Sequence, residues 1–537
     1  MQGATPLKES SPKTPLLSIE TISFIILWAT LAVMLIARFQ LLGMPLERDE
    51  GGYAYIGQHL LGSEQLYTDM YDIKLPGLYL LYAFFHHLPG GYEKSIHLGL
   101  MIFHIAALWL FFQWIKQLFT LKTAALSTAF FALSAVLPSI YGFATHATQL
   151  LLAPQIGALI LLWNYQYKGK SIVALLGSGL LTGIAFTIKQ PAIVFIFFGI
   201  GVLLSDRSAE WLQRIKAAFI YGFSTTIPYL IIVAYFAIQG RFSSFWFWTF
   251  TVPGAQTIQA GESWLYIKTL LPPVINEHPG LWVAGSISVV VLPFIRTGMV
   301  PQRGWITALA LLSFLSSAIG LGFMPHYFIP AIPWLAVALS LVIEFFALKI
   351  RREILVIGGA GLLVLLPPIW KNQDYLFRPN YQKISEKAYH WNGFSEIKAI
   401  SEELKKRIKP DERIAILGSE PQLNYYTNTL HCSPHLYMYP VMRDTRLKAQ
   451  FQQEFLEDFR ACDATFVIIS ASEASWIPQF TQTDFFKKEL WGYVTQQYDL
   501  IGRANIGQYP LSIVWDDAIK THRPPQCPPI FVFKKKR

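Results

Sequence analysis

The sequence has few charged residues for its length. Of its 537 residues only 15% are Asp, Glu, Lys or Arg, whereas 53% are hydrophobic and 15% are aromatic. Soluble domains carry about 25% charged residues. This shortage excludes an ordinary chain of soluble domains and indicates an α-helical protein that crosses a membrane several times.

The sequence also lacks the features of a nucleic-acid-binding protein. Its net charge is +10, but the Lys and Arg residues form short clusters between apolar runs, as in the cytoplasmic loops of membrane proteins. A glycine-rich phosphate loop is missing too, because Gly418-Ser419-Glu420-Pro421 has neither the glycine spacing nor the lysine of such a loop. We therefore expect no nucleic acid as a partner.

Cysteine is scarce, and the three cysteines are Cys432, Cys462 and Cys527. In an oxidising compartment one disulfide could form and leave one thiol, with the pairing open; three unpaired thiols are the alternative. His431 and His435 flank Cys432, but a second pair of ligands is missing. We therefore do not predict a metal site there.

Long apolar runs fill the first 370 residues. The first, 19–42, exceeds the apolar core of about 7–15 residues in a cleaved signal peptide and can span about 30 Å of hydrocarbon, so we predict a retained helix. Ten further runs of similar length predict eleven transmembrane helices in all; they lie at 95–115, 123–140, 147–165, 171–188, 191–205, 217–239, 280–295, 304–324, 327–347 and 354–370. Residues 1–16 are predicted to form a disordered cytoplasmic tail.

The basic residues predict an orientation. They cluster on alternate connections, which the positive-inside rule places in the cytoplasm; these residues are Lys8, Lys13, Lys116, Lys122, Lys168, Lys170, Arg207, Arg214, Lys216, Arg296, Arg303, Lys349, Arg351 and Arg352. The other connections, among them the loop at 43–94, are then external. An odd number of spans also places the carboxyl end outside.

From residue 371 the composition becomes that of a soluble domain. Helical patterns occur at 395–408 and 451–459, and strand patterns at 413–417, 464–470 and 530–533. We therefore predict a membrane domain at 17–370 and a soluble extracytoplasmic α/β domain at 371–537.

The external loop at 43–94 carries the charge that the rest of the membrane part lacks. Asp49 and Glu50 follow the first span, and Gly51-Gly52 allow the backbone to turn there. Apolar residues at helical spacing over 53–61 predict a short amphipathic helix on the membrane surface.

Lys74 lies just before Pro76, a residue that suits the first turn of a helix. The amino terminus of a helix favours an anion, and at the membrane surface we expect that anion to be a lipid-linked phosphate. A carboxylate such as Asp49 can take a proton from an incoming nucleophile, while Lys74 can stabilise a departing phosphate. The alternative is a solvated helix end and an interfacial lysine anchor.

Around these residues the chain resembles the bacterial GT-C glycosyltransferases related to protein O-mannosyltransferases and aminoarabinose-lipid A transferases. The resemblance covers 19–370 and depends on four segments, RDEGGYA at 48–54, KLPGLY at 74–79, GIAFTIKQP at 183–191 and HYFIPAIP at 326–333. It implies a GT-C membrane domain in the bacterial cell membrane. It also implies inverting transfer of a hexose or pentose from a polyprenyl-phosphate donor to a lipid, glycan or protein acceptor on the extracytoplasmic face.

The resemblance also implies roles for individual residues. Asp49 corresponds to the general base, with Glu50 as its neighbour or a metal ligand. Lys74 corresponds to the lysine that binds the donor phosphate.

Further residues are assigned to the substrates. His326 and Tyr327 correspond to an aromatic–cationic pair at the donor phosphate, and Lys189 is a weaker candidate for the same phosphate, with an interfacial anchor as the alternative. Tyr53 and Tyr79 are candidates for substrate binding.

The second external loop departs from the pattern of the resembling proteins. Many of those carry an acid there, but 138–149 contains no Asp or Glu, and His146 or Gln149 takes its place. His146 is therefore a further candidate for substrate binding. A two-acid metal site is not predicted, and a divalent cation is left open as a cofactor.

The external segment at 240–280 is rich in aromatic residues. Residues 245–250 favour an interfacial belt, and 256–264 are a candidate lid over the substrates.

A polytopic transporter or lipid flippase is the alternative function. Transporters keep ionisable residues in the middle of their spans, whereas Arg38, Lys189 and Glu344 fall near span ends here. A noncatalytic scaffold whose carboxyl domain binds partners is a second alternative.

Overall fold

The computed structural model describes residues 18–256, 258, 260–295, 300–390, 392–521 and 528–536. The predicted tail at 1–16, the cysteine Cys527 and two positions of the candidate lid at 256–264 lie outside these residues.

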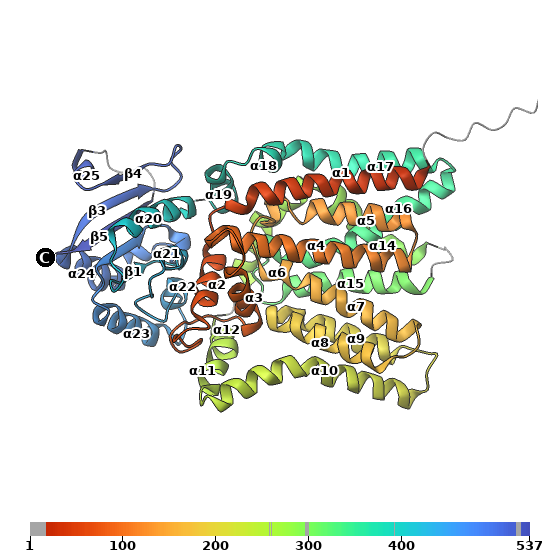
Figure 1. Ribbon diagram of the computed structural model, residues 1–537, viewed down its shortest axis with the longest axis horizontal. Helices are drawn as coiled ribbons and strands as arrows, with labels where there is room; N and C mark the ends of the chain where they lie inside the picture. Colours follow the sequence, from red (N-terminus) through yellow and green to blue (C-terminus); the bar gives the residue numbers. More distant parts are fainter. Residues whose placement is uncertain are drawn as a thin grey trace, which may run out of the picture.

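The amino-terminal part is a bundle of long helices that run side by side (Figure 1). Helices occupy each of the eleven predicted spans; their main helices are α1 Ile19–Gln40, α4 Tyr92–Leu118, α5 Leu121–Ser134, α7 Leu152–Tyr167, α8 Ile172–Ile188, α9 Ile193–Leu204, α10 Trp211–Ile238, α14 Ser286–Val291, α15 Val300–Ala318, α16 Ile332–Ile350 and α17 Glu353–Lys371. Six described segments are long and apolar enough by themselves to cross a membrane, and four shorter apolar helices accompany them. The fold is that of a multi-pass membrane protein.

The helices differ in how much of their surface other helices cover. Most of the span that contains α16 is enclosed by protein, whereas α1, α10 and α17 are covered to a much smaller extent. These outer helices present large apolar side chains such as Trp28, Phe219 and Leu363 outward. Lipid is the solvent that suits such a surface.

A buried arginine ties α1 to the second external loop. The Arg38 guanidinium donates hydrogen bonds to the Gly142 carbonyl oxygen at 2.5 Å and to Gln149 Oε1 at 2.8 Å, and it contacts His104 Nδ1. A buried charge is tolerated when it is hydrogen-bonded in this way. Gln149 is therefore engaged in holding Arg38.

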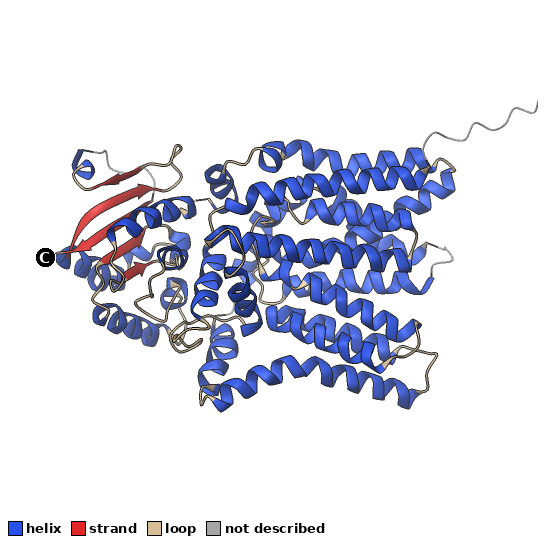
Figure 2. Cartoon of the chain, viewed as in Figure 1, coloured by secondary structure: helices blue, strands red, loops and turns tan. Residues whose placement is uncertain are grey.

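The carboxyl-terminal part contains one five-stranded sheet at the end of the molecule (Figure 2). The strand order is β1-β2-β5-β3-β4, with β1 and β2 parallel and the other pairs antiparallel. The strands are β1 Ile414–Leu417, β2 Phe466–Ser470, β3 Tyr498–Asn505, β4 Ile513–Trp515 and β5 Pro529–Lys535. The sequence patterns missed β3 and β4, whose outer positions are half-buried or exposed and carry only a weak apolar alternation.

Helices accompany this sheet at the positions that the sequence indicated. The two longest are α20 Phe394–Arg407 and α23 Lys448–Ala461. Shorter helices are α18 Gln373–Phe377, α19 Tyr381–Tyr389, α21 Gln422–Thr427, α22 Met438–Met442, α24 Tyr493–Gln497 and α25 Ala518–Thr521.

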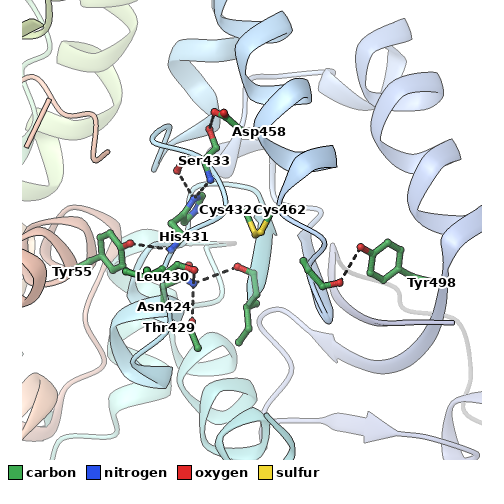
Figure 3. Close-up of a disulfide and its surroundings, with 12 residues drawn as sticks. Tyr55, Asn424, Thr429, Leu430, His431, Cys432, Ser433, Asp458, Cys462 and Tyr498 are labelled. Atoms are coloured by element: carbon green, nitrogen blue, oxygen red, sulfur yellow. Dashed lines mark hydrogen bonds between the residues drawn. A yellow bond between two sulfur atoms is a disulfide. The ribbon is translucent and has the colours of Figure 1, made fainter. Parts of the chain in front are cut away.

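The structure resolves the cysteine pairing that the sequence left open. Cys432 and Cys462 form a disulfide, with their Cα atoms 5.4 Å apart (Figure 3). His435 Nε2 lies 3.5 Å from a Glu454 carboxylate oxygen. Because the Cys432 sulfur is committed to the disulfide, the His431-Cys432-His435 group has no thiolate to offer a metal.

The loop at 43–94 differs from its prediction. Its first helix, α2 Arg48–His59, begins with a capping box formed by Glu47 and Glu50, so Asp49 and Glu50 lie in its first turn and not ahead of it. Its residues from Glu50 to Gly57 are buried, and α2 packs between α3 Pro76–His86 and α21. The interpretation of this segment as a membrane-surface helix was wrong, because the carboxyl-terminal part covers it.

Glycines make this close packing feasible. A Cβ atom at Gly52 would lie 1.8 Å from the Tyr437 hydroxyl oxygen, and one at Gly51 would lie 2.4 Å from Gln422 Cβ. The two glycines therefore serve helix contact rather than a turn.

The aromatic segment after α10 also differs from its prediction. It forms α11 Phe242–Trp246, the π-helical turn Phe247–Thr251, α12 Val252–Ala255 and α13 Ala260–Glu277. Trp246 and Phe250 are exposed, as a belt requires, but Phe245 and Trp248 are buried. The Trp248 ring stacks on Tyr71 with ring centroids 4.1 Å apart. The buried side chains of Phe245 and Trp248 therefore pack this segment against the rest of the protein.

Candidate active site

The candidate site lies where the first turn of α2 meets the ends of several spans on the side of the carboxyl-terminal part (Figure 1). Asp49 comes from α2, Lys74 from the turn before α3, Lys189 from the turn between α8 and the 3₁₀ helix Gln190–Ala192, and Tyr327 from the 3₁₀ helix Pro325–Ala331. Asp49 is close enough to act electrostatically on both lysines. Lys189 Nζ lies 4.0 Å from the centre of the Tyr327 ring.

Asp49 has an available carboxylate. The side chain is half-buried and makes no hydrogen bond or ion pair with any residue that the structure describes. It lies in the first turn of α2, the end of a helix at which the macrodipole stabilises negative charge. This carboxylate can accept a proton or bind a cation.

Glu50 is committed to structural contacts. Its Oε1 atom accepts hydrogen bonds from the Thr145 amide at 2.5 Å and pairs with His97 Nε2 at 3.0 Å, and its Oε2 atom accepts from the Glu47 amide at 3.3 Å. Burial opposes ionisation, but the adjacent His97 holds the pKa of Glu50 below its usual value. Glu50 thus joins α2 to the second external loop and to α4.

A different acid stands beside Asp49. Ligand atoms of Glu47, Asp49 and His146 all lie within 4.8 Å of one another. Burial, together with the Asp49 and Glu50 charges, raises the pKa of Glu47, while burial lowers the pKa of His146 to about 4. His146 is therefore neutral at pH 7, the form that binds metal ions. The sequence analysis missed Glu47, whose side chain is turned towards the site by its N-cap position.

The two lysines form a cationic pair beside Asp49. Burial opposes the charge of Lys74, yet the Asp72 and Asp49 carboxylates raise the pKa of Lys74 above its usual value. Burial and the charge of Lys74 lower the pKa of Lys189, which lies in the turn after α8. A bound anion would favour the charged form of both amines.

Aromatic side chains line the space around these charges. Tyr53 and Tyr79 are buried with their ring centroids 6.1 Å apart, and the Tyr79 hydroxyl faces the Asp72 carboxylate. The His326 ring stacks on His146, with centroids 3.8 Å apart and planes 7° from parallel. His326 therefore supports the imidazole of His146 as well as lying near the lysines.

The carboxyl-terminal part adds two tyrosines that sequence reasoning missed. Tyr437 is buried and Tyr439, in α22, is half-buried; both lie near Asp49 and Asp72, and desolvation together with these carboxylates raises both of their pKa values. They lie almost 400 positions from Asp49, and no local sequence signal points to them.

Polar contacts hold this part against α2. The Arg48 guanidinium donates to the Ser419 carbonyl oxygen at 2.7 Å and to Asn392 Oδ1 at 2.9 Å. Figure 3 shows Tyr55 beside His431, whose amide donates a hydrogen bond of 2.9 Å to the Tyr55 hydroxyl. Residues from 392 onward therefore cover the candidate site.

Comparison with known proteins finds relatives in sequence and in fold. The family model described as dolichyl-phosphate-mannose-protein mannosyltransferase matches residues 74–238, a range that contains Lys74 and Lys189. No curated protein sequence matches the chain.

Several solved structures are similar across nearly the whole chain. ArnT from Cupriavidus metallidurans in the apo state is 11% identical, with 94% of this chain and 97% of that chain covered and a TM-score of 0.57. ArnT bound to undecaprenyl phosphate is 12% identical, with the same coverage and a TM-score of 0.56. The oligosaccharyltransferase from Archaeoglobus fulgidus is 11% identical over 93% of this chain and 74% of that chain, with a TM-score of 0.50.

These similarities agree with the residues at which the sequence resembles the same superfamily. The chain therefore has the membrane fold of the GT-C glycosyltransferases.

Proposed function

We propose that this protein transfers a hexose or pentose from a polyprenyl-phosphate donor to an acceptor hydroxyl on the extracytoplasmic face of a bacterial cell membrane. The observation that carries the proposal is the Asp49 carboxylate, which has no hydrogen-bond partner among the described residues and lies near the half-buried pair Lys74 and Lys189. Base and anion-binding cations thus meet in one space at the ends of the spans.

The reaction is a single displacement. Asp49 takes the proton of the acceptor hydroxyl while the oxygen of that hydroxyl forms a bond to the anomeric carbon. The bond between that carbon and the phosphate oxygen breaks, and the configuration inverts. Lys74 and Lys189 stabilise the negative charge that develops on the departing polyprenyl phosphate.

A divalent cation fits the residues beside the base. Two carboxylates and one neutral imidazole form a mixed oxygen and nitrogen set that suits zinc or manganese, and here these would be Glu47, Asp49 and His146. Such an ion would act as a Lewis acid. The three side chains would hold it at the first turn of α2.

The similar proteins support a lipid-linked donor. One of the similar ArnT structures contains undecaprenyl phosphate, and the matching family model is named for a dolichyl-phosphate sugar. The alternation of basic connections supports an external position for the loop at 43–94 and for residues 371–537. In this proposal the soluble domain closes the site from outside with Tyr437 and Tyr439.

A transporter or flippase is a weaker alternative. The charged groups within the bundle are engaged in packing: Arg38 is held by backbone carbonyls, and Glu344 accepts hydrogen bonds from Thr120 at 2.9 Å and from Thr123. Neither lies free along a path for an ion.

The test is an Asp49→Asn variant, with Asp69→Asn in the same loop as the matched control. Asp69 Oδ2 accepts a hydrogen bond from the Gln65 amide and lies outside the cluster of Asp49, Lys74 and Lys189. Lipid and glycan profiles of cells with and without the protein identify the missing sugar. We expect Asp49→Asn to lower transfer of that sugar by about 10²–10⁴-fold, the usual contribution of a general base.

Both variants should insert into the membrane at the wild-type level, and Asp49→Asn should still bind undecaprenyl phosphate. A normally expressed Asp49→Asn protein with full transfer activity would refute the proposal.

A further inference from the structure

A cavity of about 710 Å³ lies next to the candidate active site, at the junction of the helix bundle and the carboxyl-terminal part. Its walls come from the 3₁₀ helix Pro138–Ile140, from α13, and from α18 and α19. Figure 1 shows α18 and α19 at this junction, beyond the end of α17. The volume falls within the range of about 300–1,000 Å³ that is typical of small-molecule sites.

The cavity is rich in positive charge. Lys371, Arg378, Lys383 and Lys387 line it, against the acids Glu277 and Asp374. Glu277 accepts a hydrogen bond from the Ser139 amide at 2.9 Å, and burial raises its pKa, which reduces the negative charge that it adds.

Two of these cations have no direct contact with an acid among the described residues, although Lys387 acts electrostatically on Glu277. Within the described part of the chain, the exposed side chains of Arg378 and Lys387 make no ion pair and no hydrogen bond. Lys371 donates to the Asn276 carbonyl oxygen at 3.2 Å, and Lys383 lies over the Tyr509 ring at 4.6 Å. The free cations give the cavity a preference for anions.

The cavity is separate from the donor-phosphate lysines but adjoins the reacting centre. Of the described residues that line it, none is Asp49, Lys74 or Lys189. Tyr141 forms part of its wall, and the Tyr141 ring centroid lies 6.2 Å from that of His146. A ligand in the cavity would therefore be one aromatic ring away from the Glu47, Asp49 and His146 cluster.

The position also suits a ligand at the membrane surface. Lys371 is the last residue of α17, and Pro325 stands at the start of the helical segment that leads into α16. Both residues line the cavity, together with the apolar Leu270 and Pro273 of α13. The cavity thus lies at the ends of two spans, with a cationic wall opposite a partly apolar one.

We propose that this cavity binds the acceptor, and that the acceptor is an anionic, phosphate-bearing sugar headgroup. The proposal rests on the proposed glycosyl transfer, because it places the second substrate of that reaction. Arg378 can hold a phosphate through two parallel N–H groups, while Lys387 acts as a point charge. The headgroup then extends past Tyr141 and presents its hydroxyl to Asp49.

The test uses the full-length protein in phosphatidylcholine nanodiscs. The soluble probe is N-acetylglucosamine 1-phosphate, compared with neutral N-acetylglucosamine, and binding is measured by calorimetry. The double variant Arg378→Gln/Lys387→Gln removes the two free cations, and Lys406→Gln is the control, an exposed lysine of α20 that does not line the cavity. A lipid-borne probe, phosphatidylinositol 4-phosphate against phosphatidylcholine, is followed by native mass spectrometry.

We expect the wild type to prefer the phosphorylated probe and to lose affinity as the salt concentration rises. The double variant should bind about 25-fold more weakly, since one charge pair at 4 Å in water contributes about fivefold. Lys406→Gln should bind like the wild type. If the wild type binds only the lipid-borne probe, or only the soluble one, the result would support the site and identify the source of the headgroup.

Equal binding by the wild type and the double variant, or binding of neither probe, would overturn the inference. Failure of the proposed function is a distinct result: an Asp49→Asn protein that transfers sugar normally refutes the base, whatever the cavity binds. The double variant should keep its affinity for undecaprenyl phosphate, because its changes lie outside the donor-phosphate lysines.

Discussion

Replacing Arg48 with glutamine tests how the carboxyl-terminal part holds α2. The Arg48 guanidinium donates to the Ser419 carbonyl oxygen and to Asn392 Oδ1, and it lies 3.5 Å from Glu420 Oε1. Glu420 is fully buried and also accepts a hydrogen bond from the Ser475 hydroxyl at 2.9 Å. The variant therefore leaves a buried carboxylate without its cation.

The expected cost follows from that burial. Breaking a buried ion pair from one side costs about 3–5 kcal/mol, so Arg48→Gln should lower the free energy of unfolding by this amount. Glu420→Gln leaves no buried charge and should cost less. In the double variant the two losses should not add, with a coupling energy of about 1–3 kcal/mol.

The deficit should depend on pH. Burial raises the pKa of Glu420, and the nearby Arg48 lowers it, so removing Arg48 should raise this pKa further. An acid whose pKa is raised in the folded state lowers the free energy of unfolding at high pH, where the acid is ionised. This loss of stability becomes smaller as the pH falls and the acid is protonated. The difference between wild type and Arg48→Gln should therefore be largest above neutral pH and decrease as the pH falls.

The assay is thermal unfolding in detergent of the wild type, both single variants and the double variant, between pH 5 and pH 8. Undecaprenyl phosphate binding shows whether each protein is folded at the start. Strict additivity of the two losses, or a deficit that grows as the pH falls, would refute the account of Arg48 as the cation for Glu420.

Three further predictions follow from single contacts. Gly52→Ala should abolish transfer, because its Cβ would lie 1.8 Å from the Tyr437 hydroxyl oxygen, and Tyr437→Phe should restore part of the activity and expression. Lys189→Gln should weaken undecaprenyl phosphate binding about tenfold. Because the pKa of Lys189 is lowered in the free protein, the wild type should take up protons when it binds this ligand and should lose affinity as the pH rises. Calorimetry in buffers of different ionisation enthalpy would measure this proton uptake. A Cys432→Ser/Cys462→Ser protein should lose about 3–4 kcal/mol of stability, since the disulfide closes a loop of 30 residues, and an unchanged melting temperature would contradict this.

The helix bundle could be predicted because its signals are local. Each span needs an apolar run of suitable length, and such a run is visible without knowledge of its neighbours. Pro76 likewise marked the start of α3 by its fixed backbone angle, and the structure confirms the proline at the first helical position.

The site could be predicted only in outline. Asp49, Lys74, Lys189 and Tyr327 do come together, but the sequence predicted Glu50 as a neighbour of the base or a metal ligand. Hydrogen bonds to Thr145 and His97 commit Glu50 to structure. Those partners lie on other loops and spans.

What the sequence by itself determined was the position of the apolar spans, the loop that carries the charge and the residue types of the candidate site, because these depend on short-range composition and spacing. Only the tertiary structure decided that α2 is buried, that Glu47 and not Glu50 stands beside Asp49 and His146, and that Tyr437 closes the site. These outcomes depend on contacts between residues hundreds of positions apart. No local pattern records such contacts, since the space and the charges that favour them exist only when the two parts of the chain have packed together.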